Sequence, residues 1–278
     1  MEKITKYAYA KINWSLFITG IRENGYHELD MLMQEVDLHD DIEMEKADRT
    51  ELIVNGLTSD DQSNLVLKAL NALSHECGKE LPVRISLTKR IPSRAGLGGG
   101  SSDCARTLMG INELYDLDIP VSRMEEIAVK LGADVPFFLK GGLCRVRGIG
   151  EKVDDVKNAA SFPIVIKHVG DGLSTPEVYK MSDLLGLEMG ENTDEVQKGI
   201  LTRDMEKVKK SSANALEKAA FTLDGNIPEA IRKLYEEGAL YARMSGSGSA
   251  VYAAFDSEDS AERAASGLTG AFIAHTCQ

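Results

Sequence analysis

The segment Pro92–Asp103, which reads PSRAGLGGGSSD, constrains the fold of this chain more than any other stretch. Four of the five residues at 96–100 are glycine, which costs conformational entropy unless the backbone approaches another group closely or takes a positive φ. An alternating apolar run at Val83–Thr88 predicts a strand before it, and the apolar period of residues 101–115 predicts a helix after it. Backbone N–H groups between a strand and the positive end of a helix dipole bind anions, so the segment predicts a phosphate-binding loop.

Two familiar phosphate loops do not fit this spacing. The Walker A loop requires Gly-Lys followed by Ser or Thr, and that triplet is absent. The dinucleotide fingerprint requires a third glycine three residues after the second, and counting from Gly96 and Gly98 that position is Ser101. A mobile surface linker is the alternative, but linkers seldom lie tightly between an apolar strand and an apolar helix. We expect the hydroxyls of Ser101 and Ser102 to cap the helix or to contact a phosphate or its Mg²⁺.

The charge balance disfavours several classes of partner. The 278 residues carry 32 Lys and Arg against 44 Asp and Glu, a formal net charge of −12. Such a chain repels a nucleic-acid backbone or an anionic membrane unless it has a basic patch, and its longest basic clusters are only Lys207–Lys210 and Lys89–Arg90. We therefore predict no nucleic-acid partner and no membrane association. No signal-peptide core opens the sequence, and the four cysteines are scattered, so we expect a cytoplasmic protein with free thiols and no metal site formed by clustered ligands.

Strand and helix patterns mix along the chain without a regular alternation. This predicts an α+β fold with two layers, and the length suggests two domains or one large domain. The strands are expected at 6–14, 15–20, 30–38, 40–45, 51–54, 83–88, 163–168, 240–244, 249–255 and 271–275. The helices are expected at 64–75, 101–115, 122–131, 175–185, 228–238 and 258–267, with 191–217 helical but interrupted by loops. Asn24-Gly25 predicts a tight reversal, and Ser122 with Glu125 predicts a capping box.

Four further features carry both an ordinary and a functional interpretation. Lys11 is either a solvated strand lysine or a charge that shares one face with Asn13. Asp134, before Val-Pro, is either a helix N-cap or a carboxylate for chemistry. Tyr26-His27 is either a half-buried pair beside a turn or a recognition element, and the glycine-rich stretch 244–249 is either a plain hairpin turn or part of a site.

Several motifs together resemble one family, the GHMP small-molecule kinases, in which Pro-x-x-Ala-Gly-Leu-Gly-Gly-Gly-Ser-Ser is the ATP-phosphate motif. Within that family the chain is similar to the members that act on 4-diphosphocytidyl-2-C-methyl-D-erythritol in the non-mevalonate isoprenoid pathway. The further matching segments, which occur in the family's order, are Ala10-Lys11-Ile12-Asn13, Asn24–Leu29, Leu131–Phe138, Gly148–Glu151, Thr175–Tyr179 and Met244–Gly248.

The resemblance implies a two-domain GHMP kinase fold. Residues 1–154 would form an N-terminal ATP-binding domain that resembles domain 2 of ribosomal protein S5, and residues 155–278 a ferredoxin-like C-terminal domain. The implied reaction transfers the γ-phosphoryl group of ATP, with Mg²⁺, to the 2-hydroxyl of the cytidine diphosphate-linked methylerythritol. The alternatives are another GHMP kinase, of mevalonate or homoserine type, and a non-catalytic ATP-binding relative. We expect a monomer or a weak homodimer.

The resemblance also implies roles for individual residues. Asp134 would face the acceptor hydroxyl with Lys11 beside it, so that a carboxylate accepts the proton and an ammonium stabilises charge. The nucleotide would contact the loop residues Pro92, Ser93, Arg94, Ala95, Gly96, Leu97, Gly98, Gly99, Gly100, Ser101 and Ser102. The acceptor would contact Asn13 at its erythritol end and a polar group of Thr175, with its base stacked between Tyr26 and Tyr179 and hydrogen-bonded by His27.

Overall fold

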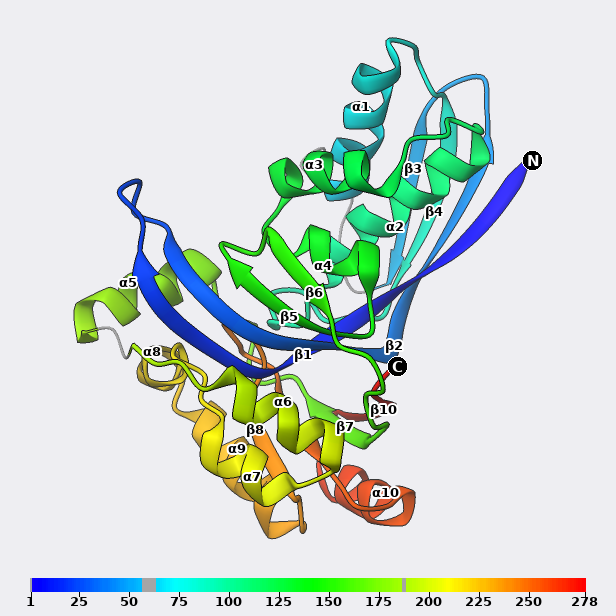
Figure 1. The fold of residues 1–278 in the computed structure, drawn as a ribbon. Helices are drawn as coiled ribbons and strands as arrows, with labels where there is room; N and C mark the ends of the chain where they lie inside the picture. Colours follow the sequence, from blue (N-terminus) through cyan, green and yellow to red (C-terminus); the bar gives the residue numbers. More distant parts are fainter. Residues whose placement is uncertain (1, 57–63, 187–188) are drawn as a thin grey trace. The chain divides into compact units, whose positions relative to one another are not determined.

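The computed structural model, drawn in Figure 1, describes residues 2–56, 64–186 and 189–278. The chain divides into two compact units. Unit 1 contains residues 1–10, 38–93 and 98–141, and unit 2 contains residues 11–37, 94–97 and 142–278. Strands β1 (Lys3–Ile21) and β2 (His27–Lys46) each contribute residues to both units. The sequence predicts two family domains that meet after residue 154. The two compact units group the chain differently, since each is built from several segments, so that boundary stays a prediction.

Strands β1 and β2 pair as a long hairpin. Its turn is the predicted one: Arg22 N–H donates to the Tyr26 carbonyl at 2.7 Å, and Gly25 has a φ of +82°. The prediction of two strands on each side of this turn was wrong, because each side is a single long strand. Neither glycine nor proline interrupts residues 3–19 or 27–46, so nothing in the sequence ends the extended backbone there.

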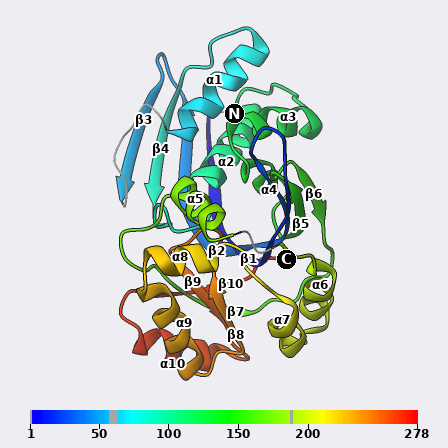
Figure 2. The same ribbon diagram turned by 90° about the vertical axis from the view of Figure 1, so that its left-hand side faces the viewer.

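Unit 1 contains a sheet covered by helices. Strand β4 (Val83–Lys89) pairs antiparallel with residues 41–46 of β2 and parallel with β3 (Glu51–Gly56). Its helices are α1 (Leu65–Cys77), α2 (Gly99–Leu114), α3 (Val121–Leu131) and α4 (Val135–Lys140). They lie together on one side of β3 and β4, and α2 packs against both α1 and α4 (Figure 2). The alternating burial of β4 places its apolar side chains in this core.

Two expectations for unit 1 need correction. The capping box at Ser122 was wrong, because the helix begins at Val121 after extended Pro120 and no side chain caps it. Ser122 therefore already lies inside the first turn. Helix α4 was implied only by the N-cap interpretation of Asp134 and was not among the helices expected from periodicity, since its run of five apolar residues is too short to show a helical period.

Unit 2 contains a four-stranded antiparallel sheet in the order β10-β7-β9-β8, formed by β7 (Pro163–Lys167), β8 (Tyr241–Met244), β9 (Val251–Ala254) and β10 (Ala271–His275). Numbered along the chain, this is the order 4-1-3-2 with helices after the first and third strands, which is the expected ferredoxin-like arrangement. In the same unit, β5 (Leu143–Gly148) pairs with residues 29–34 of β2 and with β6 (Lys152–Asp155).

The helices of unit 2 are α5 (Thr175–Leu185), α6 (Thr193–Thr202), α7 (Met205–Ser211), α8 (Glu217–Leu223), α9 (Asn226–Glu236) and α10 (Glu258–Gly267). Helix α9 packs on β8 and β9, and α10 packs on β7 and β10. Buried aromatic rings fill the core. The ring centroid of Trp14 lies 5.6–5.8 Å from the ring centroids of Phe162, Tyr241 and Tyr252. Helices α5 and α10 have the predicted bounds, whereas β5 and β6 were missed because they are short and each follows closely after glycines.

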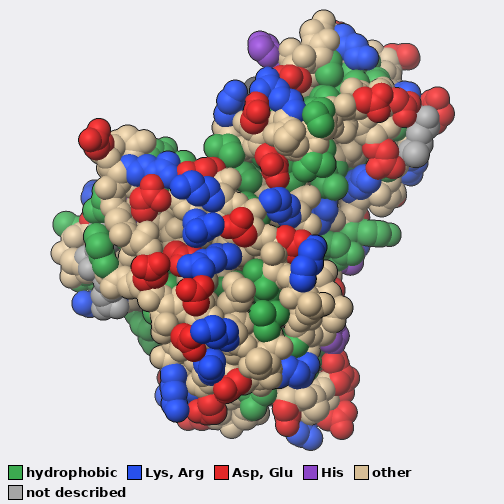
Figure 3. Space-filling model, viewed as in Figure 1, with side chains coloured by type: hydrophobic (Ala, Val, Ile, Leu, Met, Phe, Trp, Pro, Cys, Tyr) green, Lys and Arg blue, Asp and Glu red, His purple; other side chains and the backbone are tan. Residues whose placement is uncertain are grey.

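Acidic and basic side chains are interspersed on the face drawn in Figure 3. Within the ranges that the structure describes, no helix is both long and apolar enough to cross a membrane.

His275, at the end of β10, predicts a pH dependence of stability. Hydrogen bonds to Glu258 and Asp37 raise its pKa above the ordinary value. A histidine with a raised folded-state pKa stabilises the fold fully below about pH 6.5 and loses this contribution as the pH rises through the folded value. We expect urea unfolding to show a loss of stability above pH 6.5 that His275→Gln removes. His75→Gln, at an exposed histidine of α1, should leave the pH profile unchanged, and an unaltered profile for His275→Gln would contradict the assignment.

Candidate active site

Lys11 and Asn13 lie on one face of β1, as the period of a strand predicts. Both are almost fully buried, with 3% and 1% exposure, and Lys11 Nζ donates to Asn13 Oδ1 at 2.5 Å. The solvated-lysine interpretation of Lys11 is therefore wrong. A buried ammonium is costly unless it meets polar groups, so this position is built to hold a cation at a fixed point.

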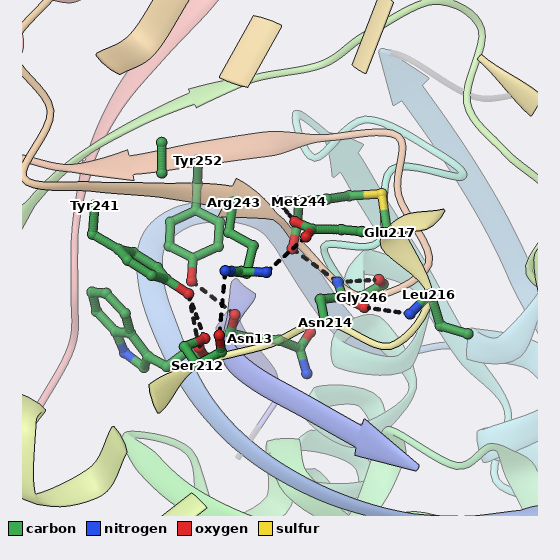
Figure 4. A network of polar contacts seen from close by, with 12 residues as sticks. Asn13, Ser212, Asn214, Leu216, Glu217, Tyr241, Arg243, Met244, Gly246 and Tyr252 are labelled. Atoms are coloured by element: carbon green, nitrogen blue, oxygen red, sulfur yellow. Dashed lines mark hydrogen bonds and ion pairs between the residues drawn. The ribbon is translucent and has the colours of Figure 1, made fainter. Parts of the chain in front are cut away.

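Hydroxyl groups of two tyrosines, one on β8 and one on β9, fix the backbone of β1 at and next to Asn13 (Figure 4). Tyr252 OH donates to the Asn13 carbonyl at 2.8 Å, and Tyr241 OH donates to the Trp14 carbonyl at 3.0 Å. The Ser212 hydroxyl also contacts the Trp14 carbonyl and lies 2.7 Å from Tyr241 OH. Every member of this group is buried, so it is rigid, and it sets the position from which Lys11 and Asn13 project.

The glycine-rich turn between β8 and β9 contacts Lys11. Asn214 Nδ2 donates to the carbonyls of Met244 at 3.1 Å and Gly246 at 2.8 Å, which holds the turn in place (Figure 4). Gly246 has a φ of +55°, and a Cβ built on it would lie 2.9 Å from Lys11 Nζ and 2.9 Å from the Gly96 carbonyl oxygen. The turn is thus more than a hairpin connection, since it packs directly on Lys11.

A partly buried ion pair supports the same turn. Arg243 donates to Glu217 Oε2 at 2.7 Å, and Glu217 Oε1 accepts from the Met244 N–H at 3.0 Å. Burial raises the pKa of Glu217, and Arg243 opposes that rise. Replacing either partner would leave a partly buried charge without its counterpart, so the pair acts as a structural support for the turn.

Residues 94–97 of the predicted phosphate loop belong to unit 2 and are held by backbone contacts. Lys11 N–H donates to the Leu97 carbonyl at 2.9 Å, and Ala250 N–H donates to the Ala95 carbonyl at 3.0 Å. Gly96 has a φ of +75°, and a Cβ on it would lie 2.0 Å from the Ser245 carbonyl oxygen. The close approach of the loop backbone to another group, which the glycine density predicts, is therefore present between Gly96 and Ser245. Arg94, also at positive φ, has an exposed side chain.

The remaining loop residues, Pro92, Ser93 and 98–102, belong to unit 1, where α2 begins at Gly99. No side chain caps this helix, whose N-cap position is Gly98 with a φ of +73°. The Ser102 hydroxyl is fully buried and has no hydrogen-bond partner among the described residues. An uncapped helix N-terminus with an unsatisfied hydroxyl in its first turn has the donors and acceptors that an anion and its counter-cation require.

A buried group of three charges anchors this helix start. Lys89 Nζ, at the end of β4, donates to Asp103 Oδ2 at 2.6 Å and also to Asp40 Oδ2. Asp40 Oδ1 accepts from the backbone N–H groups of Arg90 and Ile91, at the entrance of the loop. Burial raises the pKa of Asp103 to about 7, against the opposing effect of Lys89. Asp40, Lys89 and Asp103 received no role from the sequence, although Lys89 lies shortly before the loop and Asp103 directly after it.

Asp134 lies at the N-cap position of α4, but its side chain makes no capping hydrogen bond. The helix start is instead favoured by Pro136 in its first turn. The carboxylate is partly exposed, and the residues that follow, 135–139, are buried. Asp134 therefore holds the N-cap position with proline in the first turn, as the capping interpretation predicts, but its side chain does not cap the helix, and its role stays a prediction. That Asp134 and Lys11 face the same hydroxyl stays a prediction.

The predicted base-recognition residues belong to unit 2, and the structure brings some of them together. His27 stacks on Tyr179 with ring centroids 4.8 Å apart and an interplanar angle of 26°. Thr175 Oγ1 lies 2.8 Å from Ser247 Oγ, which connects α5 to the glycine-rich turn. Tyr26 is 60% exposed, and none of the ring pairs among the described residues includes it. A stacked base between Tyr26 and Tyr179 stays a prediction.

Two family patterns match the chain. The N-terminal domain of the GHMP kinases matches residues 64–142, and the C-terminal domain of the GHMP kinases matches residues 196–274.

Curated relatives match nearly the whole chain. A 4-diphosphocytidyl-2-C-methyl-D-erythritol kinase of Geobacter sulfurreducens is 40% identical, over 95% of this chain and 94% of the relative. The enzyme of the same name from Thermoanaerobacter pseudethanolicus is 38% identical, over 92% of this chain and 89% of its own length. A crystal structure of 4-(cytidine 5'-diphospho)-2C-methyl-D-erythritol kinase superposes with a TM-score of 0.86 at 32% identity, covering 99% of this chain and all of that one. A homoserine kinase from Cytophaga hutchinsonii shares the fold, with a TM-score of 0.75 at 20% identity over 100% of this chain and 95% of its own.

Proposed function

We propose that this chain, which belongs to the GHMP kinase family and within it to the 4-diphosphocytidyl-2-C-methyl-D-erythritol kinases, phosphorylates that compound at its 2-hydroxyl with ATP. The reaction is a step of the non-mevalonate route to isoprenoid precursors. The observation that carries the proposal is the match, at 38–40% identity, to relatives of that name along nearly the full length. The His27–Tyr179 ring pair supports it, because a kinase for mevalonate or homoserine has no base to recognise.

The chemistry follows from the residues described above. Phosphoryl transfer needs little covalent help, so the protein mainly positions the reactants and stabilises charge. The uncapped N-terminus of α2 binds the phosphates of ATP through backbone N–H groups. Asp134 accepts the proton of the attacking hydroxyl, and the buried Lys11 ammonium stabilises the charge that develops on the transferring group.

Mg²⁺ fits the loop in unit 1. The buried Ser102 hydroxyl without a partner, together with Ser101 in the same turn, supplies oxygen atoms of the kind that Mg²⁺ prefers. The ion would neutralise phosphate charge when it enters with ATP. Cytoplasmic location and a monomeric or weakly dimeric state are further parts of this proposal.

An ADP-release assay with a panel of acceptors tests the function. We expect turnover with 4-diphosphocytidyl-2-C-methyl-D-erythritol and none with mevalonate or homoserine. Turnover with one of the latter would assign another GHMP kinase activity, and ATP binding without turnover of any acceptor would assign a non-catalytic relative.

Removal of the ring of Tyr26 or of His27 should change the binding of the acceptor and leave the binding of ATP unchanged. Tyr26→Ala is expected to weaken acceptor binding by about 1–3 kcal/mol, the value of a lost base-stacking contact. His27→Ala should reduce discrimination among bases, because a base-edge group then loses its partner. Calorimetric titration of each ligand separates the two effects. Loss of ATP binding with acceptor binding intact in both variants would show that the recognition site is misplaced.

A further inference from the structure

Helix α5 holds the ring of His27 from two directions. The ring stacks on Tyr179, and its Nε2 lies 2.8 Å from Asp183 Oδ1. Tyr179 and Asp183 are one helical turn apart, so they share one face of α5. The His27 side chain is 10% exposed, whereas that of Asp183 is 50% exposed. The stack fixes the plane of the ring, and the hydrogen bond fixes its rotation within that plane.

The contact with Asp183 also determines which nitrogen of His27 carries a proton. An ionised carboxylate only accepts hydrogen bonds, so Nε2 must be the donor. In a neutral imidazole the other nitrogen, Nδ1, is then an acceptor. Within the part of the chain that the structure describes, no hydrogen bond uses Nδ1, which leaves its lone pair for a ligand.

Pyrimidine bases differ at the group that such an acceptor can read. Cytosine carries an exocyclic amino group that donates, whereas uracil carries a carbonyl oxygen at the same position that accepts. At that position an Nδ1 acceptor therefore accepts from the amino group of cytosine and is repelled by the carbonyl oxygen of uracil. With the proton on Nδ1 instead, the preference would be reversed.

We propose that Asp183 is a specificity-determining positioning residue: it holds His27 in the Nε2–H form, so that Nδ1 selects acceptors whose pyrimidine carries an amino group. This inference rests on the proposed function and adds to it a residue outside the family motifs of the sequence. Asp183 does not touch the substrate; it acts through His27. Stacking on Tyr179 alone would fix the ring plane without choosing between the two tautomers.

Kinetic discrimination between two acceptors tests the proposal. The kcat/KM of the intact protein is measured for 4-diphosphocytidyl-2-C-methyl-D-erythritol and for its uridine counterpart. Asp183→Ala should reduce the cytidine-to-uridine ratio by roughly tenfold to a hundredfold, because the freed ring can present Nδ1–H to the uracil carbonyl. Asp183→Asn keeps an acceptor oxygen but adds a donor. Its cytidine-to-uridine ratio should therefore lie between those of the wild type and Asp183→Ala. Glu177→Gln, the same charge change at an exposed position of α5, should leave the ratio unchanged.

Nitrogen-15 NMR of His27 gives a readout that needs no substrate. The wild-type ring should show the Nε2–H tautomer, and Asp183→Ala should shift it toward a mixture of the two neutral forms. A wild-type ring that is protonated on Nδ1 would overturn the proposal, even if the enzyme is active.

The outcomes separate this proposal from the function on which it rests. If the wild type turns over the cytidine acceptor and Asp183→Ala lowers both kcat/KM values equally, Asp183 only supports α5 and the proposal is wrong, while the proposed function stands. If the wild type turns over neither acceptor although its ring is in the Nε2–H form, the function fails and the selective role fails with it.

Discussion

Asp134→Asn is expected to lower kcat by roughly 10²–10⁴-fold while the affinities for ATP and the acceptor stay nearly unchanged. Asparagine keeps the shape of the side chain and removes the carboxylate that we propose as the acceptor of the hydroxyl proton. Since Asp134 makes no capping hydrogen bond, the substitution should cost little stability. Steady-state kinetics with ligand titrations and a urea unfolding curve check all three expectations.

A true capping aspartate provides the control for Asp134. Asp204 accepts from the Lys207 N–H at 3.0 Å at the start of α7, so Asp204→Asn should leave kcat at the wild-type value. Lys11→Met should also slow turnover, and the Lys11–Asp134 double variant should lose less than the product of the two single effects if the pair acts as a unit. A folded Asp134→Asn protein with wild-type kcat would remove Asp134 from the mechanism.

Gly246→Ala is expected to lower kcat by about 10²-fold, because an added Cβ would lie 2.9 Å from Lys11 Nζ and 2.9 Å from the Gly96 carbonyl oxygen. Either the ammonium or residues 94–97 of the loop must shift. If Lys11 acts as proposed, displacing its ammonium by a fraction of an ångström should lower turnover even where the protein remains folded.

Gly238→Ala separates this contact from backbone strain. Gly238 has a φ of +88°, but a Cβ on it would meet no atom within 4 Å. Both variants should lose similar stability from a non-glycine residue at positive φ, and only Gly246→Ala should lose activity. Equal turnover in the two variants would show that the turn does not position Lys11.

The elements that could be predicted from the sequence are those with a strong local signal. Helices such as α5 and α10 have a clear period and clear ends, and the loop at residues 92–102 is specified by its own glycines. The short helix α4 and the strands β5 and β6 offer too few residues for a period to show. Residues 3–21 were divided because an apolar stretch inside a long strand looks like a second strand.

The supporting residues of the candidate site could not be predicted, because they become neighbours only through the fold. Asp40, Lys89 and Asp103 lie up to 63 positions apart in the sequence (103 minus 40) and meet in one buried ionic group. Asn214 is distant in sequence from the turn that it holds. Asp183 is the exception, since its spacing of one turn from Tyr179 on a predicted helix was a usable signal.

The central claim is that this chain transfers a phosphoryl group from ATP to the 2-hydroxyl of 4-diphosphocytidyl-2-C-methyl-D-erythritol. Phosphorus-31 NMR of a reaction that contains the purified protein, ATP, Mg²⁺ and this acceptor tests it most directly. We expect a new phosphomonoester signal that grows in equal amount with ADP. It should show no splitting by a proton on the ester carbon, because the carbon at position 2 carries none. A new phosphomonoester at another hydroxyl, or ADP formed without any phosphorylated acceptor, would contradict it.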